Sequence, residues 1–105
     1  MARAVYSELL VAELGLTGSA TFTVPAGFRC VLRDLDAYNG GTFTSDTIFL
    51  HGQLGQAIWY GQTSSSEGSY HSWRGRQVID QGLTFAVAVS GTWDVTVSGY
   101  LLTLP

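Results

Sequence analysis

The chain has 105 residues, of which 46% are hydrophobic and 12% are charged, and its formal net charge is −3. This length supports one hydrophobic core, so we expect a single domain over residues 1–105. The low charge content excludes a disordered acidic or basic tail, and the negative net charge argues against a surface that binds nucleic acid. The lone cysteine, Cys30, excludes an internal disulfide and a zinc site built from the cysteines of one chain.

The cations of the chain are all arginines, and aromatic residues make up 12% of the sequence. Protein interfaces are enriched in arginine and aromatic residues and depleted in lysine and glutamate. The composition therefore predicts a surface that is partly covered by copies of the same chain or by partner proteins. The alternative is a small acidic monomer that relies on serine, threonine and glutamine for solubility.

No apolar run approaches the roughly 18 residues that a membrane-spanning helix requires. The first residues also lack the cationic segment and the long apolar block of a secretory signal peptide. We therefore expect neither a transmembrane segment nor a signal peptide.

The segment of residues 5–14 is compatible with a helix or with a strand, because its apolar residues fit either period. Strand-like alternation dominates the rest of the chain, so we favour a strand here too. Residues 1–16 are thus expected to form either the first strand or an arm.

The next segments alternate more clearly. Residues 20–24 alternate apolar side chains with threonines, which predicts a half-buried strand. Pro25 and Gly27 then favour a tight turn, because proline fixes φ and glycine permits a positive φ. An extended strand with a mixed pattern is expected over residues 28–38.

Shorter segments separated by glycines fill the second half of the chain. Two strands are expected to be joined across Gly52–Gly55, and a serine-rich loop follows them. The last two strands are expected to form a hairpin around Ser90-Gly91-Thr92. The apolar end, residues 100–105, is expected to dock in its own sheet or on a neighbour. The expected strands span residues 47–51, 56–61, 69–74, 77–80, 83–89 and 93–98.

About eight short strands with glycine-rich turns and no convincing helix predict an all-β protein. We expect an antiparallel β-sandwich of the jelly-roll-like type, because eight strands in two sheets suit this length.

The histidines and the cysteine do not form a recognisable reactive site. His51 lies near Asp46 and His71 near Glu67 in the sequence, but metal sites normally show clustered ligands, so ordinary histidines are favoured. Cys30 lies in an apolar stretch, where a free cysteine is usually inert. There is no Gly-x-Ser-x-Gly motif for a nucleophilic serine. We expect no enzymatic activity, no metal and no cofactor.

Asp34 and Asp36 are two residues apart on an expected strand and should point to one face. Such a pair can bind Ca²⁺ or hydrolyse glycosides. Because Arg33 and Arg29 are close in the sequence, we favour a structural ion pair across strands or subunits.

An aromatic cluster around the serine-rich loop is the strongest local feature. Alternation places neighbours such as Trp59 and Tyr60 on opposite faces, so one ring of each pair should lie outside the core. If the flanking strands pair, Trp59 would face Trp73, or Tyr60 would face Tyr70. Exposed rings of this kind pack against proteins or stack on sugars. The cluster contains Trp59, Tyr60, Tyr70, His71 and Trp73, followed by Arg74 and Arg76.

Four segments resemble small β-rich virion proteins of tailed bacteriophages, especially siphophages of actinobacteria. The segments are Phe22–Arg29, Val31–Leu35, Trp73–Val78 and Trp93–Leu102. The resemblance runs from about residue 18 to the end and rests on the order and spacing of these segments. It implies a structural protein of the particle, without catalysis, of the minor tail or capsid accessory type.

The sequence therefore predicts a non-enzymatic bacteriophage virion protein that self-associates or docks on the particle. A minor tail or tail-tip component is favoured, capsid decoration is the close alternative, and a carbohydrate-binding β-sandwich is a further one. The expected partners are copies of itself and tail or major capsid proteins, with a host surface glycan as an additional candidate, and neither nucleic acid nor membrane. The expected location is the virion, after assembly in the host cytoplasm. The candidate contact residues are Arg3, Val5, Trp59, Tyr60, Tyr70, His71, Trp73, Arg74, Arg76 and Leu102.

Overall fold

The computed structural model describes residues 8–40, 45–63 and 69–105. These residues form an all-β, antiparallel fold of the sandwich or jelly-roll class, as the alternation in the sequence predicted. The number of strands differs from the prediction, since six strands replace about eight. They are β1 (Glu8–Thr23), β2 (Phe28–Asn39), β3 (Thr47–His51), β4 (Ala57–Gln62), β5 (Ser69–Ile79) and β6 (Thr84–Thr103).

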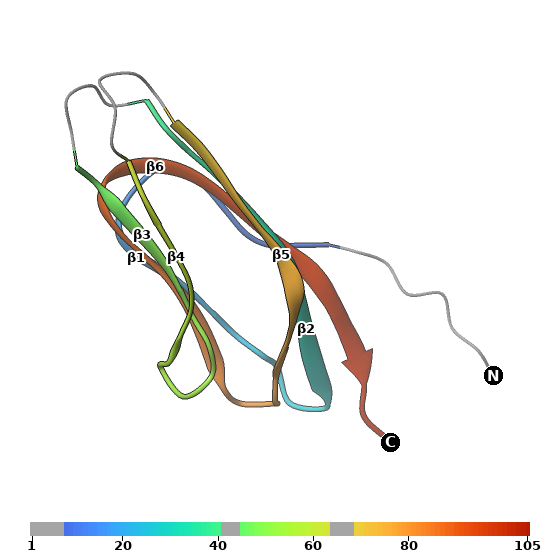
Figure 1. The fold of residues 1–105 in the computed structure, drawn as a ribbon. Helices are drawn as coiled ribbons and strands as arrows, with labels where there is room; N and C mark the ends of the chain where they lie inside the picture. Colours follow the sequence, from blue (N-terminus) through green and yellow to red (C-terminus); the bar gives the residue numbers. More distant parts are fainter. Residues whose placement is uncertain (1–7, 41–44, 64–68) are drawn as a thin grey trace.

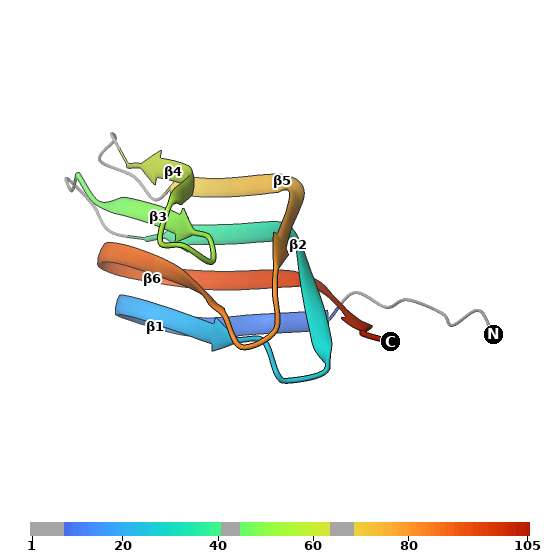
Figure 2. The same cartoon turned by 90° about the horizontal axis from the view of Figure 1, so that it is seen from below.

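Two layers arise because β1 and β6 are long enough to belong to both (Figures 1 and 2). In the layer that we call the small layer, residues 84–89 of β6 lie between β3 and the second half of β1, and β4 pairs with β3. In the large layer, residues 94–103 of β6 lie between β2 and the first half of β1, and β5 pairs with β2. Consecutive strands change layer at most connections, which is the crossing pattern of a jelly roll.

The prediction of a hairpin around Gly91 was wrong, because the chain does not reverse its direction there. Residues 84–103 form the single strand β6, which curves from one layer into the other (Figure 1). Gly91 has a φ of 79°, and the paired strand β1 bends beside it at Gly15 and Gly18, where φ is 71° and 88°. The pairing register shifts over the same stretch of β1. Turn-forming residues therefore mark a bend in two paired strands, not their end.

Two further boundaries differ from the prediction. The expected strands at 5–14 and 20–24 are one strand, β1, so the strand interpretation of the N-terminal segment holds from residue 8 onward. The expected strands at 69–74 and 77–80 are likewise one strand, β5. Gly75 lies within β5, and a Cβ at this position would be 2.6 Å from the nearest ring carbon of Trp73, so the indole of Trp73 requires a glycine here.

At the end of the sandwich opposite the bend of β6, the connections are those that the sequence predicted. The Phe28 amide donates to the Pro25 carbonyl at 3.2 Å, which closes the turn at Pro25–Gly27. The apolar C-terminal segment docks in its own sheet, because Thr103 pairs with Phe28 and the Leu104 amide donates to the Gly27 carbonyl at 2.8 Å. The strands β3 and β4 form the expected hairpin across Gly52–Gly55.

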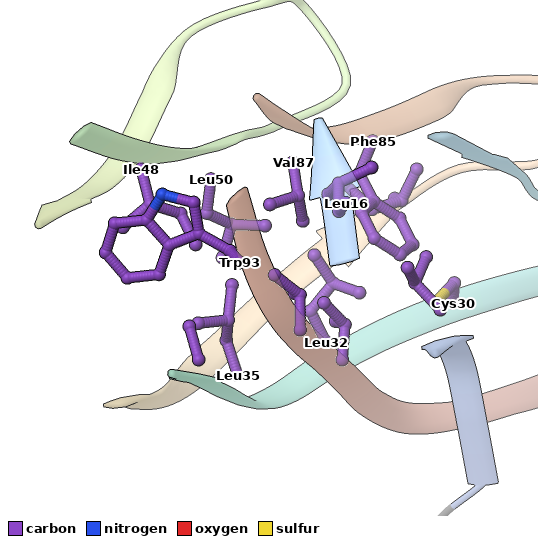
Figure 3. Close-up of a cluster of buried hydrophobic side chains, with 14 of the residues drawn as sticks. Leu16, Cys30, Leu32, Leu35, Ile48, Leu50, Phe85, Val87 and Trp93 are labelled. Carbon is purple, nitrogen blue, oxygen red and sulfur yellow. The ribbon is translucent and has the colours of Figure 1, made fainter. Parts of the chain in front are cut away.

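Side chains from both layers fill the space between them (Figure 3). The alternating residues of β6 point inward, and Phe85, Val87, Trp93 and Val97 are fully buried. Burial of each such side chain stabilises the fold by about 1.5–3 kcal/mol. Cys30 is also buried in this core, as expected for a cysteine in an apolar stretch.

Candidate interaction surface

The rings of the predicted aromatic cluster are divided between the core and the surface. Trp59 on β4 and Trp73 on β5 are half-buried and pack against the core between the layers. Tyr60 and Tyr70 point outward and are 47% and 64% exposed. The strands β4 and β5 do not pair with each other, because β4 pairs with β3 and β5 with β2. The condition under which these rings would face one another across paired strands is therefore not met, whereas the prediction that one ring of each pair lies outside the core is confirmed.

His71 lies on the inner side of β5, between the rings of Trp59 and Trp93. The ring centroids are 6.5 Å and 5.7 Å from that of His71. Its Nε2 is buried, and no hydrogen bond reaches it from the described residues. His71 is thus part of the packing between the layers and not an exposed contact residue.

The outer face of the large layer collects most of the remaining candidates. Every second residue of β5 from Tyr70 to Val78 is exposed there, including Arg74 and Arg76. Leu102 of β6 is on the same face and is 38% exposed. Tyr38, which was not among the predicted contact residues, is the cross-strand partner of Tyr70 and is 45% exposed.

A groove of about 480 Å³ crosses this face above β6. Tyr70 and Tyr38 line it from β5 and β2, and Glu13 and Leu14 line it from β1. Between these walls the lining side chains are shorter, because β6 contributes Asp94 and Thr96 and β1 contributes Ala12. The groove therefore lies between the two tyrosine rings on one side and Glu13 and Leu14 on the other, with shorter side chains between them.

Asp94 and Tyr38 hold defined positions in the groove. The Gly15 amide donates to Asp94 Oδ1 at 2.9 Å, which ties the bend of β1 to β6. The ring of Tyr38 lies over Gly40, since a Cβ at that position would be 3.3 Å from a ring carbon. Tyr38 could have been found from the sequence, because it continues the outward series that begins with Asp34 and Asp36.

Arg74 binds both carboxylates of the Asp34–Asp36 pair, at 3.3 Å and 2.9 Å. The predicted structural ion pair across strands therefore exists, but its cation is Arg74 and not Arg33 or Arg29. Arg33 instead donates to the Gly75 carbonyl from a bulge that β2 forms in its pairing with β6.

Asp36 also accepts a hydrogen bond from the Tyr70 hydroxyl at 2.9 Å. Partial burial of Asp36 acts to raise the pKa of its carboxyl, but the hydrogen bonds from Arg74 and Tyr70 outweigh burial and lower this pKa below its ordinary value. The same hydrogen bond to Asp36 raises the pKa of Tyr70. Asp36 is therefore a carboxylate over most of the pH range, and it adds negative charge beside the groove.

Arg76 differs from the other arginines of the described segments. Arg29 pairs with Asp80 at 2.9 Å, Arg33 donates to Gly75, and Arg74 binds the two aspartates. Arg76 is exposed on the outer face of β5, and within the described chain it makes no ion pair or hydrogen bond. The outer face thus presents both a largely apolar groove whose lining includes three carboxylates and an arginine that is not neutralised.

The other candidates lie elsewhere. Arg3 and Val5 are outside the described residues, and so is Glu67, which had been considered beside His71. His51 contacts the Gly55 carbonyl at 3.2 Å and the ring of Phe49, whereas Asp46 accepts a hydrogen bond from Asn39. Within residues 8–40, 45–63 and 69–105, no three potential metal ligands lie together. None of these segments forms a helix long and apolar enough to cross a membrane.

Comparison with protein-family models and with curated proteins gives no match. Among solved structures, the chain is similar to one described as "Structure of infectious bursal disease virus Gx strain", with 14% sequence identity and a TM-score of 0.40. The similarity covers 95% of this chain and 32% of the other, so this chain spans about a third of the length of that protein.

Proposed function

We propose that this chain is a non-enzymatic structural protein of a bacteriophage virion that self-associates or docks on the particle, as a minor tail or tail-tip component. The proposal starts from the resemblance of four sequence segments to small virion proteins of tailed phages. The jelly-roll class of fold is compatible with this role, since it recurs in capsid proteins, but it also recurs in lectins and therefore does not decide the function.

The observation that carries the proposal is the exposure of large hydrophobic side chains on a chain that has no lysine. Leu14 is 88% exposed and Leu9 is 66% exposed, and both lie on β1, which within the described residues pairs only with β6. An edge strand without lysine, arginine or proline is open to pairing with another chain. Leu54, in the turn between β3 and β4, is 81% exposed. Contact with neighbouring subunits would cover these side chains.

Capsid decoration is the second candidate, and the distribution of these side chains favours it. Leu54 and Leu83 lie in turns, whereas Leu9, Tyr60 and Leu102 lie on strands, so exposed apolar groups occur on several sides of the molecule. A protein that clamps between subunits needs contacts on more than one side.

The structure does not favour the carbohydrate-binding alternative, because the two tryptophans that could stack on a sugar are not on the open surface. A stacking platform would be built from Trp59, Tyr60 or Trp73, but Trp59 and Trp73 pack against the core and only Tyr60 of these three is largely exposed.

Particles from cells that produce the phage encoding this chain would test the proposal. We expect mass spectrometry to detect the chain in purified particles and gold-labelled antibodies to mark the tail tip. Labelling of the shell would support decoration in place of the tail assignment. A chain that is abundant in the lysate but absent from purified particles would overturn the virion role.

A further inference from the structure

The outer face of the large layer carries two features that complement each other in charge and shape. One is the groove lined by Tyr38, Tyr70, Glu13 and Asp94. The other is the exposed guanidinium of Arg76, which has no partner within the described chain. We propose that the groove of one copy binds Arg76 of a second copy, so that this face forms a contact between subunits. The inference rests on the self-association in the proposed function and specifies its surface.

The groove suits a guanidinium more than a neutral or anionic ligand. Glu13, Asp36 and Asp94 bring three carboxylates to its lining, and Arg74 is the nearby cation that the structure pairs with one of them. A guanidinium can stack on a tyrosine ring and also donate to carboxylates. A neutral sugar would gain little from this negative charge, and an anionic sugar would be repelled by it.

Arg76 cannot occupy the groove of its own copy. It lies on the same strand as Tyr70 but six residues further along, which corresponds to about 20 Å at roughly 3.3 Å per residue. An arginine side chain spans only about 7 Å from its Cα. The two features must therefore meet between different molecules.

The surroundings of Arg76 would add apolar contact. Val78 is 41% exposed on the same face of β5, and Leu102 is 38% exposed on β6. At the groove, Leu14 and the two tyrosine rings remain exposed. The contact would thus combine an arginine and aromatic rings, which are enriched at interfaces, with aliphatic side chains that add buried apolar area.

Complementary variants of the full chain test the contact. Arg76→Glu leaves the groove intact, whereas Thr96→Arg fills the floor of the groove and leaves Arg76 intact. We expect sedimentation velocity or native mass spectrometry to detect self-association of the parent protein and at least a tenfold weaker association of each variant. An equimolar mixture of the two variants should form a one-to-one complex, because each supplies the half that the other lacks.

Matched controls come from the opposite layer, where Thr21 is exposed on β1. Thr21→Arg and Thr21→Glu introduce the same side chains away from the proposed contact and should associate like the parent. Circular dichroism and thermal unfolding would check that all variants fold.

Three results would overturn the inference. They are a parent protein that stays monomeric up to about 1 mM, folded Arg76→Glu or Thr96→Arg variants that associate as the parent does, and a mixture that gives no complex. None of these bears on whether the chain is found in particles, so the proposed function is tested separately. Association that persists in both variants but is lost in Leu14→Glu would assign the contact to the edge of β1.

Discussion

Gly91 lies directly against the carboxylate of Asp46, and a Cβ on Gly91 would overlap Asp46 Oδ2. The contact joins the bend of β6 to the start of β3. Asp46 Oδ2 also accepts a hydrogen bond from Asn39 Nδ2 at 2.9 Å, and Asn39 is buried. The backbone of Asp46 exchanges hydrogen bonds with Thr63, since the Asp46 amide donates to Thr63 Oγ1 and the Thr63 amide donates to the Asp46 carbonyl, both at 2.9 Å. Gly91 is thus the point at which β6 bends around a partly buried polar network.

We expect Gly91→Ala to be strongly destabilising for two reasons that can be separated. A φ of 79° costs a non-glycine residue about 1–2 kcal/mol, and the clash with Asp46 adds to that cost. Gly27→Ala is the matched control, because Gly27 has a φ of 88° but no atom within 4 Å of its Cβ position. Urea unfolding should show a loss of about 1–2 kcal/mol for Gly27→Ala and a clearly larger loss for Gly91→Ala. Equal losses would show that Asp46 moves aside freely.

A double-mutant cycle measures the contact itself. Asp46→Ala removes the carboxylate that the new methyl group would meet, so Gly91→Ala should cost less in that background than in the parent. Because residues in contact typically couple by about 0.5–3 kcal/mol, the difference should be measurable. Additive losses would mean that backbone conformation alone explains the requirement for glycine.

At the bend of β6, the sequence predicted which residues are buried but did not predict the path of the chain. The alternation of apolar residues in β6 predicted which residues are buried on both sides of Gly91, because a strand keeps its two faces through a bend. The same pattern could not distinguish a bend from a hairpin, since both need a residue with positive φ. In the structure β1 pairs with β6 on both sides of Gly91, through Leu16 with Trp93 and Gly18 with Val89, and such long-range pairing is not encoded in the local sequence.

The candidate surface was predictable to a similar degree. Alternation correctly predicted that one ring of each neighbouring pair lies outside the core, and the structure shows that these rings are Tyr60 and Tyr70. It also correctly predicted that Asp34 and Asp36 share a face, since both carboxylates reach Arg74. Sequence distance suggested Arg33 and Arg29 as their ion-pair partners, but pairing of β2 with β5 brings Arg74 opposite Asp34. The sequence did not predict the groove, because its lining residues come from four strands, β1, β2, β5 and β6, which only the fold brings together.

The pH dependence of stability should report on Asp36. Its pKa is lowered in the folded protein, so the ionised carboxyl stabilises the fold above the ordinary pKa of about 3.9. This stabilisation is lost as the pH falls through the lowered value. The difference in unfolding free energy between the parent and Asp36→Asn should therefore be largest near neutral pH and should shrink below about pH 4. A difference that is constant down to about pH 2 would contradict the lowered pKa.

An independent readout comes from Tyr70, whose pKa is raised by its hydrogen bond to Asp36. In an alkaline ultraviolet titration, the Tyr70→Phe variant identifies the absorbance change that belongs to this residue. In Asp36→Asn, the pKa of Tyr70 should fall toward its ordinary value. An unchanged titration would show that the hydrogen bond does not persist in solution.

Replacement of Trp73 should affect the fold more than any surface contact. Trp73 is half-buried, packs against the core and covers Gly75, so Trp73→Ala should lower the free energy of unfolding by about 2–4 kcal/mol. Arg76→Ala, two residues along the same strand, should change it by less than about 0.5 kcal/mol. Denaturant titration of both variants measures the contrast. If Trp73→Ala and Arg76→Ala were equally stable, Trp73 would be assigned to a surface contact and not to the core.

His71 offers a substitution that should be tolerated although the residue lies between two tryptophans. Its Nε2 is buried without a hydrogen-bond partner in the described part of the chain, and a buried polar atom without a partner costs about 1–3 kcal/mol. Phenylalanine is close in size and keeps the ring contacts with Trp59 and Trp93. We therefore expect His71→Phe to leave the thermal midpoint unchanged or to raise it, whereas His71→Ala should lower it because the ring contacts are lost. If His71→Phe were as destabilising as His71→Ala, the imidazole would be making a polar contact that packing alone does not explain.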